Sequence, residues 1–282
     1  MQTKKKVSVN DIIAMKGTEK ISVLTAYDYS TSMICDRAGI DILLVGDSAG
    51  MVVLGYQSTV QVGMPEMIMF CGAVARGTKR AMIVGDMPFG SYQPNANLAV
   101  ENAVQLIKAG CDAVKLEGGS EIIGSIKAIV DAGIPVIGHI GLKPQTSSLW
   151  EGYKQQGRTK ESAKKLIHDA RDLERAGAFS IVLEMVASEV ASAITKNVSV
   201  PTIGIGSGGD CDGQVLVLHD MLGLYEDIKP KFVKRYAELS KSIFEAVSSY
   251  TSEVKAGKFP GELNTFHMGA EELEKFRKDR KK

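Results

Sequence analysis

Closely spaced cysteines are absent from this sequence. The four cysteines are widely scattered and form no CxxC pair; they are Cys35, Cys71, Cys111 and Cys211. This spacing excludes a zinc site built on paired thiolates and gives no sign of a disulfide framework. Each cysteine lies inside or beside an apolar stretch, where a buried thiol behaves as a small hydrophobic side chain. We therefore expect four reduced, structural thiols.

A large excess of charge is also missing. The sequence has 34 lysines and arginines against 33 acidic residues, a net charge of +1, so no global field attracts nucleic acid or an anionic membrane. No uncharged run reaches the roughly 20 residues of a membrane-spanning helix, and the basic N-terminus lacks the apolar region of a signal peptide. We expect a cytoplasmic protein that recognises small molecules, with neither a nucleic acid nor a membrane as partner.

Short apolar runs, in contrast, recur along the whole chain. Eight are rich in β-branched residues and nearly continuous in apolar character, which is typical of parallel strands enclosed by a barrel and covered by helices. They lie at 21–27, 41–47, 81–86, 113–118, 135–142, 180–186, 201–208 and 214–220. Segments of helical period between them include 97–109, 120–132, 160–176 and 187–196. No GxGxxG motif follows the first run, which counts against a dinucleotide-binding fold. The sequence predicts a (β/α)₈ TIM barrel of the α/β class.

Helix ends and flanking segments complete the predicted domain. Four helical segments end in Ala-Gly, at positions 38–39, 109–110, 132–133 and 176–177, where glycine supplies a left-handed cap. Residues 7–17 predict a short helix that covers one barrel end, with Asn10 as its N-cap. Residues 231–256 predict a further helix, and a loop and a solvated helix follow. We expect one domain over residues 1–282, with the barrel at about 20–230 and the C-terminal helices at about 231–282.

Three acidic residues stand at the C-terminal ends of consecutive predicted strands. Asp47 follows ILLVG, Asp86 follows MIVG, and Glu117 follows AVKL. Active sites of TIM barrels form at this end, and neighbouring strands lie about 5 Å apart, so the three carboxylates can converge. A hard divalent cation would remove their mutual repulsion, and Mg²⁺ is the natural candidate, although Mn²⁺ or cobalt suits the same oxygens. The alternative for each acid alone is an N-cap of the following helix.

Further polar residues interrupt the predicted strands. Lys115 and Glu117 lie two apart and share a strand face, so they form either a structural ion pair or part of a pocket that binds an anionic ligand. Glu184 is one carboxylate in an otherwise apolar strand, which favours a general acid or base. His139 ends the fifth strand, where it contacts substrate, bridges to a carboxylate, or is simply a packed histidine.

Taken together, the motifs resemble the ketopantoate hydroxymethyltransferase family. The resemblance runs in unbroken order from about residue 7 to about residue 267 and is carried by GDSAGMVVLGYQST (46–59), GDMPFGSY (85–92), AVKLEGG (113–119), GHIGLKPQ (138–145), GYKQQGR (152–158), LE (183–184), IGIGSGGDCDGQVLVLHD (203–220) and FPGE (259–262). It implies transfer of a hydroxymethyl group from 5,10-methylenetetrahydrofolate to 3-methyl-2-oxobutanoate, giving 2-dehydropantoate in pantothenate and coenzyme A biosynthesis. It also implies a Mg²⁺-chelated enolate mechanism and a homo-oligomer, commonly a decamer in the family.

The resemblance also implies roles for single residues. Matching positions give metal ligands, substrate contacts and a proton acceptor. The metal ligands are Asp47, Asp86 and Glu117, and the proton acceptor is Glu184. The ketoacid contacts are Asp47, Ser48, Asp86 and Lys115. His139, at the end of the fifth predicted strand, is a further candidate for substrate contact. Two positions depart from the family pattern: Ala49 stands where leucine is usual, and Phe70 where histidine is common. These departures put the folate contacts and the packing around the second strand in doubt.

Two other functions fit the same residues. One is a Mg²⁺-dependent 2-oxoacid aldolase or a lyase related to phosphoenolpyruvate mutase, which would act on the same ketoacid without folate. The other is a noncatalytic binding barrel, since a fold alone does not guarantee activity. Dependence on folate separates the first from the transferase, and the four intact acids argue against the second.

Overall fold

The structure, a computed structural model, describes residues 5–146, 154–227 and 229–280. The chain divides into two compact units, Met1–Arg235 and Tyr236–Lys282. The expectation of one domain over the whole chain therefore stays a prediction. In the described ranges, every helix is too short or too polar to cross a membrane.

Eight parallel strands close into a barrel in the order in which they occur along the chain. They are β1 (Ile21–Thr25), β2 (Ile42–Val45), β3 (Met82–Asp86), β4 (Ala113–Glu117), β5 (Val136–Gly141), β6 (Ser180–Glu184), β7 (Thr202–Ile205) and β8 (Gly213–Leu216). All eight predicted strands are present, so the predicted TIM barrel is confirmed. Strand β3 ends where its apolar run ends, and the other strands end one to four residues before their runs do.

Side chains of the strands alternate between the barrel interior and the surrounding helices. One buried cluster fills the interior and includes Met82 and Val84 of β3, Ala113 of β4 and Val182 of β6. A second, larger cluster lies between the strands and the helices. Because both faces are buried, the strands read as nearly continuous apolar runs rather than as alternating ones.

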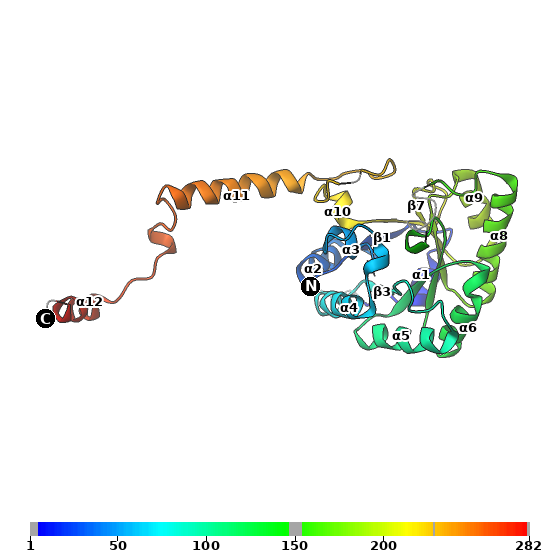
Figure 1. Cartoon of the computed structure of the whole chain (residues 1–282), viewed down its shortest axis with the longest axis horizontal. Coiled ribbons are helices and arrows are strands. Elements are labelled where there is room, and N and C mark those ends of the chain that lie inside the picture. The colour runs from blue at the N-terminus through cyan, green and yellow to red at the C-terminus, as the bar shows by residue number, and fades with distance from the viewer. Residues whose placement is uncertain (1–4, 147–153, 228, 281–282) are drawn as a thin grey trace. The chain divides into compact units, whose positions relative to one another are not determined.

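Helices surround the strands of the first unit (Figure 1). The longer ones are α2 (Tyr29–Ala38), α4 (Met64–Gly77), α5 (Ala96–Lys108), α6 (Ile123–Asp131), α8 (Lys160–Arg175) and α9 (Ser188–Asn197). The short elements are α3 (Ala49–Val52), η1 (Thr59–Gln61), η2 (Ser120–Ile122) and α10 (Leu218–Met221). The four helical segments expected between strands are present, and 120–132 begins as the 3-10 turn η2. The glycine of each predicted Ala-Gly end has a positive φ, between 84° and 110°, as a left-handed cap requires.

The first helix, α1 (Val9–Ala14), begins one position earlier than its predicted cap. Ser8, and not Asn10, is the N-cap. The Ser8 hydroxyl accepts a hydrogen bond from the Asp11 amide at 3.2 Å, while the Asp11 carboxylate accepts one from the Ser8 amide at 2.9 Å. This reciprocal pair satisfies two helix-end donors, which one asparagine cannot do. Ile12 is fully buried against the interior cluster, so the helix covers a barrel end as predicted.

The second unit contains α11 (Leu239–Lys255), η3 (Glu262–Asn264) and α12 (Ala270–Asp279). The predicted helix over 231–256 therefore begins eight positions late. Upstream, the Val233 amide donates to the Pro230 carbonyl at 3.0 Å, and Arg235 donates to the Tyr225 carbonyl at 3.3 Å. These bonds close a turn and tie the segment to the preceding loop, so they compete with the helical ladder. The final helix is exposed, as predicted.

Candidate active site and metal centre

The polar residues singled out in the sequence continue the inward alternation of the strands. Val84 and Asp86 share the inner face of β3, and Ala113, Lys115 and Glu117 share that of β4. The register pairs Asp86 with Lys115, and Glu117 with His139 of β5. Each of these three strands therefore changes from apolar to polar at its C-terminal end, on the side that faces the barrel axis.

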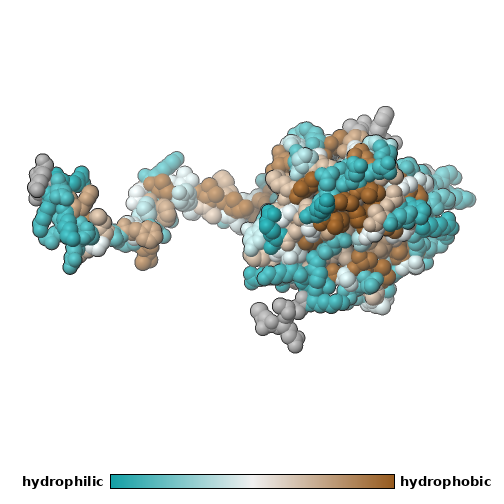
Figure 2. All heavy atoms as spheres, turned by 90° about the horizontal axis from the view of Figure 1, so that it is seen from below, coloured by the Kyte–Doolittle hydropathy of each residue, from teal (hydrophilic) through white to brown (hydrophobic). Residues whose placement is uncertain are grey.

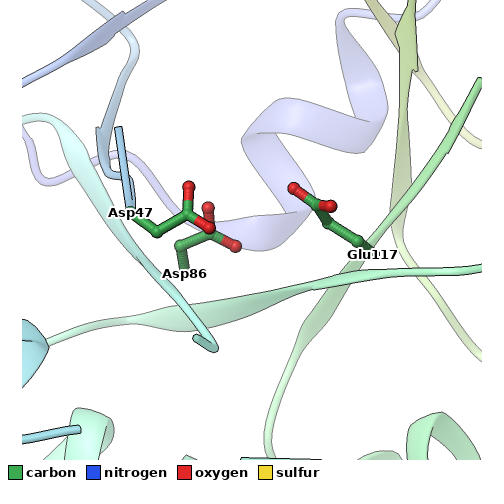
Figure 3. Close-up of side chains that lie close together, drawn as sticks. All are labelled: Asp47, Asp86 and Glu117. Carbon is green, nitrogen blue, oxygen red and sulfur yellow. The ribbon is translucent and has the colours of Figure 1, made fainter. Parts of the chain in front are cut away.

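The three predicted metal ligands converge. One carboxylate oxygen from each of Asp47, Asp86 and Glu117 lies within 4.8 Å of the other two. Figure 3 shows Asp47 and Asp86 side by side, with Glu117 pointing toward them from across the site. All three residues are buried, between 2% and 6% exposed.

None of the three carboxylates caps a helix. The N-caps of the elements that follow them are Ser48 before α3, Asn95 before α5 and Gly119 before η2. A buried carboxylate without a capping role has to be stabilised by a cation or by hydrogen bonds. The alternative interpretation of these acids as N-caps is therefore wrong.

Two cationic side chains lie among the acids. The Lys115 ammonium is 2.6 Å from Asp86 Oδ1 and 3.6 Å from Glu117 Oε1. His139 lies between two carboxylates, with Nδ1 3.4 Å from Glu117 Oε1 and Nε2 3.3 Å from Glu184 Oε2. Neither histidine nitrogen makes a well-formed hydrogen bond to the described residues. Lys115 is thus both ion-paired and part of the polar end of the barrel.

Burial and the neighbouring charges shift the pKa values of the site. Burial, and then the charges of Asp86 and Glu117, raise the pKa of Asp47 well above its usual value. Burial also raises the pKa of Asp86, against the opposing charge of Lys115. Burial and Lys115 lower the pKa of His139, but Glu117 and Glu184 outweigh them and raise it to about 9.

The residues present fit a hard divalent cation. The carboxylates of Asp47, Asp86, Glu117 and Glu184 outnumber the cations Lys115 and His139, and the described part of the cluster offers oxygen atoms rather than thiolates. Oxygen ligands are those that Mg²⁺, Ca²⁺ and Mn²⁺ prefer. A cation bound here would lower the pKa values of Asp47 and Asp86, because its positive charge stabilises the ionised form of each carboxyl group.

All seven residues predicted for the site line one cavity of about 100 Å³ at the C-terminal ends of the strands. They are Asp47, Ser48, Asp86, Lys115, Glu117, His139 and Glu184. Glu184 is the most open of the four acids, with 14% of its side chain exposed. The cavity therefore combines a buried acidic end with a carboxylate closer to solvent.

The two departures from the family pattern lie outside the cavity lining. Phe70 is buried and packs edge-on against Tyr27, with ring centroids 6.3 Å apart. The Tyr27 hydroxyl is 2.8 Å from the Ser48 hydroxyl. Ala49 is fully buried at the start of α3. Phe70 thus reaches the site only indirectly, through the tyrosine that holds Ser48.

Three polar residues of the site were not identified from the sequence. Gln145 is fully buried and hydrogen-bonds to Asp47, and Tyr92 hydrogen-bonds to Gln145. Thr59 lines the cavity, and its buried hydroxyl has no hydrogen-bond partner among the described residues. The available signal was weak: each is a polar residue in a segment that follows a strand, and only the closed barrel brings these segments together.

Known proteins of one family are similar to this chain over most of its length. The model of the family described as ketopantoate hydroxymethyltransferase matches residues 6–262. The 3-methyl-2-oxobutanoate hydroxymethyltransferase of Nitrosopumilus maritimus (strain SCM1) is 58% identical over 271 residues, which cover 96% of this chain and 97% of that protein. The protein of the same name from Syntrophobacter fumaroxidans (strain DSM 10017 / MPOB) is 55% identical over 273 residues, with 96% and 97% covered.

Solved structures share the barrel at much lower identity. The crystal structure of phosphonopyruvate hydrolase superposes with a TM-score of 0.62 at 13% identity, covering 98% of this chain and 96% of that chain. A 2,3-dimethylmalate lyase of the PEP mutase/isocitrate lyase superfamily gives a TM-score of 0.57 at 15% identity, with 97% and 98% covered. At such identities the similarity concerns the fold alone.

Proposed function

Because the chain belongs to the ketopantoate hydroxymethyltransferase family, it is a transferase that forms ketopantoate from 3-methyl-2-oxobutanoate, and we propose that this reaction takes place in the cavity of the barrel. The one-carbon donor in this proposal is 5,10-methylenetetrahydrofolate. The observation that carries it is the convergence of three buried carboxylates, a buried lysine and a more open glutamate on one cavity.

The metal of this enzyme, in our proposal, is Mg²⁺ held by Asp47, Asp86 and Glu117. The family is metal-dependent, and the excess of buried carboxylates supports a divalent cation at these residues. When bound, the ion supplies positive charge that stabilises negative charge developing on the ketoacid. The choice of Mg²⁺ rests on the preference of this ion for oxygen ligands.

The ketoacid contacts we propose are Asp47, Ser48, Asp86, Lys115 and His139. The Lys115 ammonium is the natural partner for the anionic end of the ketoacid, because a buried cation attracts a carboxylate strongly where water is scarce. Its contact with Asp86 holds it in place at 2.6 Å. The Ser48 hydroxyl, kept in position by Tyr27, supplies a neutral hydrogen bond beside it.

Glu184 is the proton acceptor in this proposal. It ends β6 and lies on the cavity wall, where its carboxylate is the most exposed of the four acids. Because it lies apart from the buried metal ligands, it is free to take a proton from the β-carbon of the ketoacid. The carbon that loses this proton then attacks the methylene carried by the folate, and water supplies the hydroxyl group as tetrahydrofolate leaves. His139, 3.3 Å from Glu184, helps to fix the direction of the carboxylate.

The alternative functions are less well supported. A folate-independent 2-oxoacid lyase shares the fold of the PEP mutase/isocitrate lyase superfamily, but that similarity stands at 12–15% identity. Relatives that carry the hydroxymethyltransferase name reach 58%. A noncatalytic barrel would have no need to keep four acids directed at one cavity.

We further propose that the chain forms a homo-oligomer, with a decamer expected from the family resemblance. Helix α11 has no buried residue, and large apolar side chains follow one of its faces at three- and four-residue spacing. They are Ile243, Val247, Tyr250 and Val254. Figure 2 shows apolar side chains on the surface of this unit. A stripe of this kind is suited to packing against a second copy of the chain.

The compartment and the extent of the domain remain proposals of the same kind. For the compartment, we propose the cytoplasm, because all four cysteines are buried and form no disulfide, as is usual in a reducing compartment. For the domain, we propose a single unit over residues 1–282.

Product formation tests the proposed function. Metal-stripped protein is incubated with 3-methyl-2-oxobutanoate and methylenetetrahydrofolate, with and without Mg²⁺, and ketopantoate is measured by mass spectrometry. We expect ketopantoate only when both folate and the metal are present. A product formed from the ketoacid without folate would instead support the lyase, and the absence of turnover under every condition would support the noncatalytic barrel.

A further inference from the structure

Gln145, in the segment after β5, contacts two of the three proposed metal ligands at once. Its side-chain amide Nε2 donates to Asp47 Oδ2 at 2.9 Å, and its backbone amide donates to Glu117 Oε2 at 3.2 Å. The same Nε2 donates to the carbonyl of Met87, the residue that follows Asp86, at 2.9 Å. One fully buried residue thus connects the ends of β2, β3 and β4.

The orientation of the Gln145 amide is determined by its neighbours. Its Oε1 lies 2.9 Å from the Tyr92 hydroxyl, which itself accepts a hydrogen bond from the Glu117 amide at 3.1 Å. A flipped amide would place Oε1 against the Asp47 carboxylate and the Met87 carbonyl, both acceptors. It would also present an N–H group to a hydroxyl that already accepts one bond. The NH₂ group therefore faces Asp47.

These bonds engage one oxygen of each carboxylate. Gln145 donates to Asp47 Oδ2 and to Glu117 Oε2, while the other Glu117 oxygen, Oε1, faces Lys115 and His139. A carboxylate fixed in this way loses less rotational freedom when a cation binds, and it cannot turn away from its partners. Tyr92 is the support behind the amide, since it contacts both Gln145 and the backbone of Glu117.

We propose that Gln145 is a positioning residue of the metal site, which orients the carboxylates of Asp47 and Glu117 and is itself oriented by Tyr92. The proposal rests on the metal site described under the proposed function and adds to it a residue outside the ligand set. It concerns the affinity of the site for the cation and the geometry of the carboxylates. It gives Gln145 no contact with the reacting carbon.

The test compares Gln145→Met with Gln105→Met. Methionine is unbranched and similar in length to glutamine, so the buried variant keeps most of the packing and loses the side-chain amide. Gln105 lies exposed on α5, where its side-chain amide donates to Asn102, so its variant controls for the substitution itself. The experiment measures the binding of Mn²⁺ alone to metal-stripped protein. Binding is detected as a loss of the EPR signal of the free ion.

We expect Gln145→Met to weaken Mn²⁺ binding by about 10- to 100-fold, and Gln105→Met to leave it unchanged. In activity assays, the Mg²⁺ concentration for half-maximal rate should rise by a similar factor, while kcat at saturating Mg²⁺ stays within a few-fold of the unmodified enzyme. If Gln145 had a purely structural role, its substitution would lower the unfolding temperature and reduce activity at every Mg²⁺ concentration. Tyr92→Phe, which keeps the ring and removes the hydroxyl, should shift Mn²⁺ binding in the same direction by less.

The outcomes separate this inference from the proposed function. If the unmodified protein binds Mn²⁺ and both Gln145→Met and Tyr92→Phe bind it equally well, the positioning role is refuted and the metal site stands. If the unmodified protein binds no Mn²⁺ at its acidic cluster, the metal site itself is refuted, and the positioning role with it. If Gln145→Met does not fold, the Tyr92→Phe affinity decides, because that variant keeps the buried ring.

Discussion

Replacing Lys115 with methionine should destabilise the metal-free protein and make it more dependent on Mg²⁺. Lys115 lies in β4 with its ammonium 2.6 Å from Asp86, and the two side chains are 5% and 3% exposed. Methionine fills a similar volume but leaves the charges of Asp86, Glu117 and Asp47 without their buried ammonium. The variant therefore tests whether these carboxylates form one electrostatic cluster.

The expected magnitude follows from this burial. Removing one partner of a buried ion pair costs about 3–5 kcal/mol, because the other charge is left uncompensated. In a chain of this size that loss corresponds to a fall in Tm on the order of 10 °C. The loss should be smaller at pH 5 than at pH 8, since carboxylates that lack a cation have raised pKa values and become neutral by taking up protons.

Thermal unfolding followed by circular dichroism measures this effect, with Lys127→Met as the matched control. Lys127 pairs with Asp131 on the surface, where the two side chains are 66% and 62% exposed, and such pairs contribute little. Mg²⁺ should raise the Tm of Lys115→Met more than that of the unmodified protein or the control. Equal Tm values for Lys115→Met and Lys127→Met, or equal shifts with Mg²⁺, would refute the reasoning.

Three further predictions concern the base, the pH dependence and the assembly. Glu184→Gln should bind the ketoacid normally, as measured by calorimetry, while kcat falls by about 10²- to 10⁴-fold; a variant with ordinary turnover would remove Glu184 as the base. Because the pKa of Asp47 is raised above 3.8 in the folded protein, its contribution to stability is present below that pH and is lost as the pH rises through the raised value. Mg²⁺ binds the deprotonated carboxylates, so the Tm shift that it causes should be larger at pH 8 than at pH 5, and a shift independent of pH would contradict this. Val247→Asp in the apolar face of α11 should reduce the mass measured by light scattering, whereas Ser252→Asp on the opposite face should not; unchanged assembly in both variants would show that this face is not the interface.

The barrel itself was predictable from the sequence because its strands are buried on both faces. Eight apolar runs and the glycines that end the helices suffice to place every strand. The convergence of Asp47, Asp86 and Glu117 was also predictable, since each lies at or just after the C-terminal end of one of three consecutive strands. The two-residue spacing of Lys115 and Glu117 further indicated that they share a face.

Features that depend on tertiary hydrogen bonds were not predictable in the same way. The capping of α1 by Ser8 depends on its reciprocal bond with Asp11, and the late start of α11 depends on bonds such as that of Arg235 to the Tyr225 carbonyl. Gln145 and Tyr92 lie 53 positions apart in the sequence. Their contact exists only once the barrel has closed, and no local periodicity encodes it.

Hydrogen exchange at the β-carbon of 3-methyl-2-oxobutanoate tests the central claim, that the acidic cavity activates this carbon, most directly. The ketoacid is incubated in D₂O with metal-stripped protein, with and without Mg²⁺, and the β-proton signal is followed by NMR. We predict that the signal disappears with the unmodified protein and Mg²⁺, that it persists without the metal, and that Glu184→Gln abolishes the exchange. Exchange that proceeds equally in Glu184→Gln, or no exchange in any condition even with folate present, would contradict the account.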